Sequence, residues 1–193
     1  FINREISWLC FARRMLNLAE DPEAPLLERV KFAGIMGMIY DEFAMKRLGG
    51  LRRLMQKKKH RLSPDGLKPL EELQLCRTEL IRQRGILADL VQHQLRPALK
   101  AEGIPILDHK DLSKSQKDEL NHYFKDSVQP ILSPLAVDIG HPFPFISSLA
   151  LNLAIPIHRP DLNQPLFIRL KVPTNRPRWV HVSEGGFVPL EQI

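Results

Sequence analysis

Proline is unevenly distributed along this chain of 193 residues, and its distribution constrains the fold more than any other feature. Six of the sixteen prolines lie in residues 1–105, at positions that suit helix starts and ends. The other ten lie in residues 106–193, where they separate short apolar segments. Because proline lacks a backbone N–H and disrupts a helix interior, long helices are favoured in the first half. The sequence therefore predicts a helical first part and a mixed second part.

Apolar residues recur at helical spacing through most of the first half. Asn3 is a suitable N-cap, Pro25 suits a first helical position, and Gly103 suits a helix end. The expected helices run from Asn3 to Leu18, from Pro25 to Met55 with a weak point at Gly49-Gly50, and from Pro69 to Gly103. Three or four helices of this kind can bury a bundle core.

Segments of strand length follow in the second half, after a short helix expected from Ser113 or Ser115 to about Val128. The expected strands are residues 131–137, 149–157, 166–172 and 179–182. Strands of this length between proline-rich joints are typical of a small sheet with one or two helices. The predicted fold class is therefore α+β: an N-terminal helical bundle, residues 1–104, followed by a small mixed α+β domain, residues 105–193.

The positive charge is concentrated in the first half. Residues 1–105 hold 19 basic and 13 acidic side chains, whereas residues 106–193 hold nine of each. From Lys46 to Arg61 there are eight Lys or Arg residues and no Asp or Glu. Such a run fits nucleic acid, nucleotide phosphates or inorganic polyphosphate, and a solvated helix face fits it equally well.

Other patterns that carry chemistry are absent from the sequence. Cys10 and Cys76 form no CxxC pattern, so we expect neither a disulfide framework nor a zinc site, and a reduced intracellular setting. No apolar run approaches the roughly 20 residues that cross a bilayer, and no signal peptide is expected at Phe1. The seven histidines form no HExxH pattern, and no glycine-rich phosphate loop is present. We therefore predict no catalytic and no metal-binding residue.

Longer strings occur along the whole chain in a fixed order. They are Phe1–Arg14, Pro25–Phe32, Asp41–Arg47, Pro130–Asp138, His141–Ser147 and Leu151–Ala154. Each string alone is a weak signal, whereas all six in this order are specific. Together they closely resemble the N-terminal and head domains of class-one polyphosphate kinase.

The resemblance implies an enzyme that reversibly transfers the terminal phosphate of ATP to polyphosphate. Its partners would be ATP or ADP, polyphosphate and further copies of itself in a homodimer or higher homo-oligomer, with no nucleic acid. The N-terminal domain would supply one wall of the adenine pocket, and the head domain would contribute dimer contacts and border the polyphosphate tunnel. We expect a cytoplasmic enzyme, with peripheral association with a membrane left open.

Catalysis in the family depends on two C-terminal domains. The resemblance places there the histidine that becomes phosphorylated and the residues that bind Mg²⁺. We therefore expect that the head domain is incomplete at Ile193 and that this piece is not catalytic alone.

The resemblance also implies a nucleotide-binding set at the end of the second expected helix, namely Ile39, Tyr40 and Phe43. The family has Ser-Asn-Leu-Asp-Glu-Phe where this chain has residues 38–43, Met-Ile-Tyr-Asp-Glu-Phe. The family asparagine contacts adenine, and Ile39 takes its place. Because the isoleucine side chain cannot form a hydrogen bond, the free energy of adenine binding would be weaker by about 0.5–1.5 kcal/mol, unless the pocket is reshaped around Tyr40.

The phosphate-binding set that we expect is Lys46, Arg47, Arg53 and Lys57. Lys46, Arg53 and Lys57 share a helix face, at offsets of seven and eleven residues. Arg47 lies inside a family-like string. The acidic residues 41 and 42 are interpreted as structural, pairing with nearby Arg or Lys.

Two other functions remain open. One is a non-catalytic regulatory or scaffold relative that binds polyanions. The other is an unrelated basic helical nucleic-acid binder, which would show a steep salt dependence of binding. The strings in the second half disfavour this third hypothesis.

Overall fold

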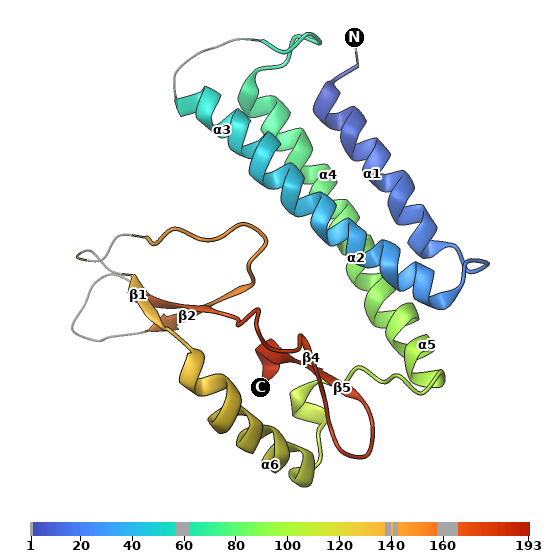
Figure 1. The fold of residues 1–193 in the computed structure, drawn as a ribbon. Helices are drawn as coiled ribbons and strands as arrows, with labels where there is room; N and C mark the ends of the chain where they lie inside the picture. The colour runs from blue at the N-terminus through green and yellow to red at the C-terminus, as the bar shows by residue number, and fades with distance from the viewer. Residues whose placement is uncertain (1, 57–61, 138–139, 141–142, 158–165) are drawn as a thin grey trace. The chain divides into compact units, whose positions relative to one another are not determined.

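The computed structural model describes residues 2–56, 62–137, 140, 143–157 and 166–193, and Figure 1 shows its ribbon. Contacts between Cα atoms divide the chain into two compact units, Phe1–Leu99 and Lys100–Ile193. This division lies five residues before the expected boundary at 104/105. The first unit is helical and the second combines a helix with strands, so the predicted α+β class is confirmed.

The helical unit is built from three long helical stretches that pack along one another (Figure 1). The second and third stretches each contain a π-helical turn that joins two α-helices. In chain order the elements are α1 (Arg4–Glu20), α2 (Leu26–Phe43), the π-helical turn Ala44–Leu48, α3 (Gly49–Gln56), α4 (Pro69–Leu90), the π-helical turn Val91–Leu95 and α5 (Arg96–Ala101).

The helix ends follow local sequence signals with one exception. Asn3 caps α1, because its side-chain oxygen accepts from the backbone N–H groups of Glu5 and Ile6, each at 3.0 Å. Gly103 follows α5 with a φ of +78°, which glycine adopts without strain. Pro25 is the exception: its ψ of 138° is extended, so α2 begins at Leu26 and the expected start was wrong by one residue.

The helical path continues through the glycine pair that was expected to weaken it. α3 begins at Gly49, directly after the π-helical turn, and Leu51 is buried. Packing against α4 therefore outweighs the low helix propensity of glycine.

Apolar side chains from α1, α2 and α4 form the core of the helical unit. The rings of Trp8 and Phe43 stack with their centroids 4.8 Å apart. Gln83 is a polar residue in this core and is fully buried. The core members that are fully excluded from solvent include Leu9, Ala12, Leu16, Ala19, Met36 and Cys76.

The α-helix of the second unit follows a 3₁₀ turn at His109–Asp111. Ser113 rather than Ser115 caps α6 (Lys114–Tyr123), because its hydroxyl accepts from the backbone N–H of Gln116 at 3.2 Å. The helix continues through a π-helical turn to Val128, which is the expected end.

The strands of the second unit form two sheets rather than one. β1 (Leu135–Val137), β3 (Leu166–Lys171) and β2 (Asn152–Ile157) lie in that order in an antiparallel sheet. β4 (Trp179–His181) and β5 (Phe187–Pro189) form a separate hairpin.

Local backbone geometry explains why the expected strands are too long. A 3₁₀ turn at Gln129–Ile131 replaces the start of the first strand, and Leu149, with a φ of 58°, precedes the second. β5 was not predicted, because three residues carry too little periodicity. Gly186 ends the β4–β5 turn, and a Cβ atom there would lie 2.8 Å from Leu107 Cδ1.

No helix among the described residues is long and apolar enough to cross a membrane.

Candidate functional site

The three predicted nucleotide-binding residues lie on the last turns of α2, at different depths. Ile39 is half-buried and packs on the core, and Phe43 is 1% exposed against Trp8. Tyr40 is 7% exposed and is the member of this set that also lines a groove. The structure therefore gives Ile39 and Phe43 a packing role, and nucleotide contact by the set stays a prediction.

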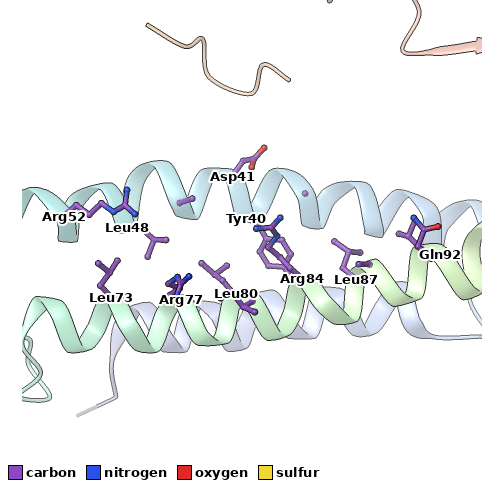
Figure 2. Close-up of a pocket in the computed structure, with 15 residues that line it drawn as sticks. Tyr40, Asp41, Leu48, Arg52, Leu73, Arg77, Leu80, Arg84, Leu87 and Gln92 are labelled. Carbon is purple, nitrogen blue, oxygen red and sulfur yellow. The ribbon is translucent and has the colours of Figure 1, made fainter. Parts of the chain in front are cut away.

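The groove runs between the α2–α3 stretch and α4 and has a volume of about 940 Å³ (Figure 2). Its lining is mostly apolar. The apolar members are Gly37, Ala44, Leu48, Leu73, Leu80, Ile81, Leu87, Ala88 and Val91, and the polar members are Tyr40, Asp41, Arg52, Arg77, Arg84 and Gln92.

A buried hydrogen-bond network fixes the phenol of Tyr40 at this groove. Its hydroxyl donates to Gln83 Oε1 at 3.1 Å, and Gln83 Nε2 donates to the Leu9 carbonyl at 2.9 Å. Burial raises the pKa of Tyr40 to about 12. The phenol is therefore neutral near pH 7 and already engaged, so it presents its ring to the groove rather than a free hydroxyl.

Three arginines on the groove were not predicted as site residues. Arg52 comes from α3, and Arg77 and Arg84 lie seven residues apart on α4 (Figure 2). Within the described part of the chain, none of the three forms a hydrogen bond or ion pair. The spacing of Arg77 and Arg84 was a usable signal, but no sequence pattern paired them with Arg52. Guanidinium groups in such a setting can bind phosphate or carboxylate.

Asp41 also lines the groove, and Figure 2 shows its side chain pointing away from α4. Its carboxylate has no partner among the described residues, so the expected pairing with Arg or Lys is not found there. Glu42 does pair, with Lys46 four residues later, and this bond holds the pKa of Glu42 below its ordinary value. The structural interpretation of Glu42 is therefore confirmed.

A second, basic pocket of about 480 Å³ lies where the start of α1 meets the π-helical turn and α3. It gathers three of the four predicted phosphate-binding residues. Its lining consists of Arg4, Glu5, Lys46, Arg47, Gly50, Leu51, Arg53 and Leu54. Four cationic side chains and one carboxylate leave this basic pocket with a net charge of +3. The remaining predicted residue, Lys57, lies outside the described residues.

Glu5 and Arg4 complete the basic pocket and were missed by the sequence analysis. Glu5 is 5% exposed and forms ion pairs with Arg4 at 2.7 Å and with Arg47 at 3.6 Å. Both residues lie in the Phe1–Arg14 string, which indicated the family without indicating a site. The pocket can hold an anion of several negative charges, because its cations outnumber its carboxylate.

The described residues offer no obvious metal site. They contain no cluster of three or more His, Cys, Asp or Glu side chains that could hold a metal ion. Both cysteines are free thiols. Burial, with smaller contributions from Glu72 and Glu5, raises the pKa of Cys76 to about 12, so this thiol is protonated and unsuited to metal binding near pH 7.

Two family models match the chain. Residues 1–107 match the polyphosphate kinase N-terminal domain, and residues 115–193 match the polyphosphate kinase middle domain. Curated relatives agree: a polyphosphate kinase of Mycolicibacterium gilvum is 43% identical over 202 residues, and one of Mycobacterium avium is 43% identical over 205 residues. Each alignment covers 100% of this chain but only 27% and 28% of those relatives.

A solved structure extends the likeness to the fold. The crystal structure of polyphosphate kinase from Porphyromonas gingivalis matches with a TM-score of 0.81 and 26% identity. The match covers 100% of this chain and 29% of that one. With two family models that together span nearly every residue, the chain belongs to the polyphosphate kinase family and corresponds to its N-terminal and middle domains.

Proposed function

We propose that this chain is the N-terminal and head portion of an enzyme that reversibly transfers the terminal phosphate of ATP to polyphosphate. Family membership supports the proposal, and the names of the curated relatives agree with it. The chain spans about 27% of the length of the Mycolicibacterium gilvum relative, so the activity is proposed for the complete protein. The chain itself contributes binding surface and is not catalytic alone.

The observation that carries the proposal is the basic pocket at the start of α1. Phosphoryl transfer depends on positioning and on electrostatic stabilisation of phosphate oxygens. The pocket supplies Lys46, Arg47 and Arg53 from one helical stretch and Arg4 from another. Its net positive charge suits polyphosphate, which carries negative charge along its whole length.

The nucleotide role is proposed for the end of α2 and its surroundings. Tyr40 places an aromatic ring beside Arg84 on the groove, a combination that suits a base and its phosphates (Figure 2). The described residues contain no cluster that could hold a metal ion. The Mg²⁺ that accompanies ATP would therefore be held by other parts of the complete enzyme. Assembly into a homodimer or higher homo-oligomer through the head domain belongs to the same proposal.

One feature favours the alternative of a non-catalytic, polyanion-binding relative. Ile39 stands where the family asparagine contacts adenine, and its side chain packs on the core. An assay of polyphosphate synthesis by the complete protein, with ATP in the presence of Mg²⁺, distinguishes the two functions. Synthesis would support the kinase. Binding of polyphosphate without synthesis would support the scaffold and overturn the kinase.

We expect the chain to bind inorganic polyphosphate with a dissociation constant that rises steeply with salt. Arg53→Gln should weaken binding about 3- to 10-fold, because it removes an exposed cation from the pocket. Arg14→Gln is the matched control: Arg14 is exposed on α1, outside both pockets, and carries the same charge. Equal weakening by both variants in a fluorescence titration would show general attraction rather than a site.

We also expect Ile39→Asn in the complete enzyme to lower the KM for ATP about 2- to 12-fold. The physical reason is one regained hydrogen bond to adenine, worth about 0.5–1.5 kcal/mol. Because Ile39 packs on the core, steady-state kinetics should be measured below the melting temperature of the variant. Ile39→Val, which keeps the packing without a hydrogen bond, should leave the KM unchanged. An unchanged or raised KM for Ile39→Asn would contradict the assignment of Ile39 to the adenine pocket.

A further inference from the structure

We propose that Glu5 is a positioning residue that holds Arg4 and Arg47 at the basic pocket so that their guanidinium groups bind a phosphate group of polyphosphate. The inference rests on the proposed function for the identity of the ligand. It adds Arg4 to the predicted phosphate-binding set and gives Glu5 the role of positioning Arg4 and Arg47.

The two oxygens of the Glu5 carboxylate serve different arginines. Oε1 accepts from Arg4 Nε at 3.1 Å and from Arg4 Nη2 at 2.7 Å. Oε2 lies 3.6 Å from Arg47 Nε. The arginines come from separate segments, the first turn of α1 and the π-helical turn after α2. One carboxylate thus brings two cations together from positions 43 residues apart in the sequence.

The carboxylate of Glu5 is buried, whereas the two arginines that it holds are exposed. The Glu5 side chain is only 6% exposed, whereas the side chains of Arg4 and Arg47 are 77% and 40% exposed. Arg47 faces Glu5 through Nε. Its two terminal nitrogens form no hydrogen bond or ion pair with the residues that the structure describes, so they remain for a ligand. Two parallel N–H groups of a guanidinium match the oxygens of a phosphate.

The anchor is itself held in place by the start of α1. Asn3 caps this helix, and its side-chain oxygen accepts from the backbone N–H of Glu5 at 3.0 Å. The Asn3 amide group in turn donates to Glu72 Oε1 on α4 at 2.9 Å. Glu5 therefore projects from a fixed helix end rather than from a loop, and a fixed anchor limits the entropy that its arginines lose on binding.

The Glu5 carboxylate is not saturated by these contacts. Among the described residues, its Oε2 atom is buried and accepts no hydrogen bond, so the attraction to Arg47 is purely ionic at 3.6 Å. Burial of a carboxylate with an incomplete set of partners is unfavourable by itself. The arrangement is better explained by the orientation that it imposes on the arginines than by the stability that it contributes.

The sign of one substitution separates a positioning role from a simple charge effect. Glu5→Gln removes a negative charge from the pocket, so Coulomb attraction alone would tighten polyphosphate binding. Loss of positioning would weaken it. We expect the dissociation constant for inorganic polyphosphate to rise at least about 3-fold, against the change in net charge.

The matched control is Glu42→Gln. Glu42 is the exposed partner of Lys46, and its substitution changes the net charge by the same amount. It releases Lys46 in the pocket but leaves the contacts of Glu5 with Arg4 and Arg47 in place. We expect equal or tighter binding for this variant. If Glu5→Gln also binds polyphosphate as tightly as the wild type or tighter, the positioning role is overturned.

A second variant keeps the test decisive if Glu5→Gln fails to fold. Glu5→Asp retains the charge but withdraws the carboxylate by one methylene, so a charge effect predicts no change and positioning predicts weaker binding. Polyphosphate titrations should be carried out at several salt concentrations and below the melting temperature of each variant. No binding by the wild type would instead overturn the proposed phosphate site itself, which distinguishes the two failures.

Discussion

Replacement of Phe43 by alanine is expected to destabilise the helical unit by about 3–5 kcal/mol. The ring is 1% exposed and stacks on Trp8, so its removal leaves a cavity between α1 and α2 and deletes an aromatic pair. Surrounding core residues are fully buried and can close such a cavity only in part. Any effect of Phe43→Ala on nucleotide binding would therefore act through packing.

Tryptophan fluorescence can report this unfolding in the full chain. Trp8 lies in the helical unit and Trp179 in the second unit, so a Trp179→Phe background isolates the signal of Trp8. Phe11→Ala is the control, because Phe11 lies on α1 but is 53% exposed, and a loss below about 1 kcal/mol is expected. A similarly small loss for Phe43→Ala in urea unfolding would contradict the packing role.

The helical unit is also expected to lose several kcal/mol of stability between about pH 9 and pH 12. Burial raises the pKa of Cys76 from 9.0 and that of Tyr40 from 10.0, in each case to about 12. In the unfolded chain both groups ionise at their ordinary values. The stability is therefore complete below pH 9 and is lost as the pH rises toward 12, because the unfolded state releases its protons first.

Two substitutions show how much of the stability lost at high pH comes from Cys76 and how much from Tyr40. Cys76→Ala should remove the part that begins near pH 9, and Tyr40→Phe the part that begins near pH 10. Tyr40→Phe also leaves Gln83 Oε1 without its donor, which costs about 1–3 kcal/mol at every pH at which the wild-type phenol is protonated. This constant loss of stability adds to the change in pH dependence above pH 10.

Urea unfolding at a series of pH values measures both effects. Cys10→Ser is the control for the thiol, because Cys10 is exposed and its replacement removes a thiol without changing the core. A pH profile that is the same for Cys76→Ala as for the wild type would show that the buried thiol does not contribute.

Local signals in the sequence were sufficient for most of the fold. The cap at Asn3, the stop at Gly103 and the apolar spacing of the long helices were predicted, because each depends on residues within a few positions. Ser113 was one of two caps predicted for α6. The second unit was predicted less well. Its strands are short and depend on partners from distant segments, and the three residues of β5 carry no periodic pattern.

The residues of the candidate site were likewise predicted only where a local signal marked them. The basic run indicated Lys46, Arg47 and Arg53, and the structure brings these three to one pocket. The basic run gave no indication of Arg4 or Glu5, which are about 40 residues away in the sequence. Helical spacing assigns residues to a face, but it does not say which other helix that face meets.

The sequence by itself determined the helix limits in the first unit to within a few residues, the α+β class and the family, because caps, prolines and ordered strings are local properties. Only the tertiary structure decided that Phe43 is a core residue, that Glu5 joins Arg4 to Arg47, and that Arg52 shares a groove with Arg77 and Arg84. The physical reason is that burial and charge pairing arise between helices. They depend on how α1, α2–α3 and α4 pack, and no short segment encodes that packing alone.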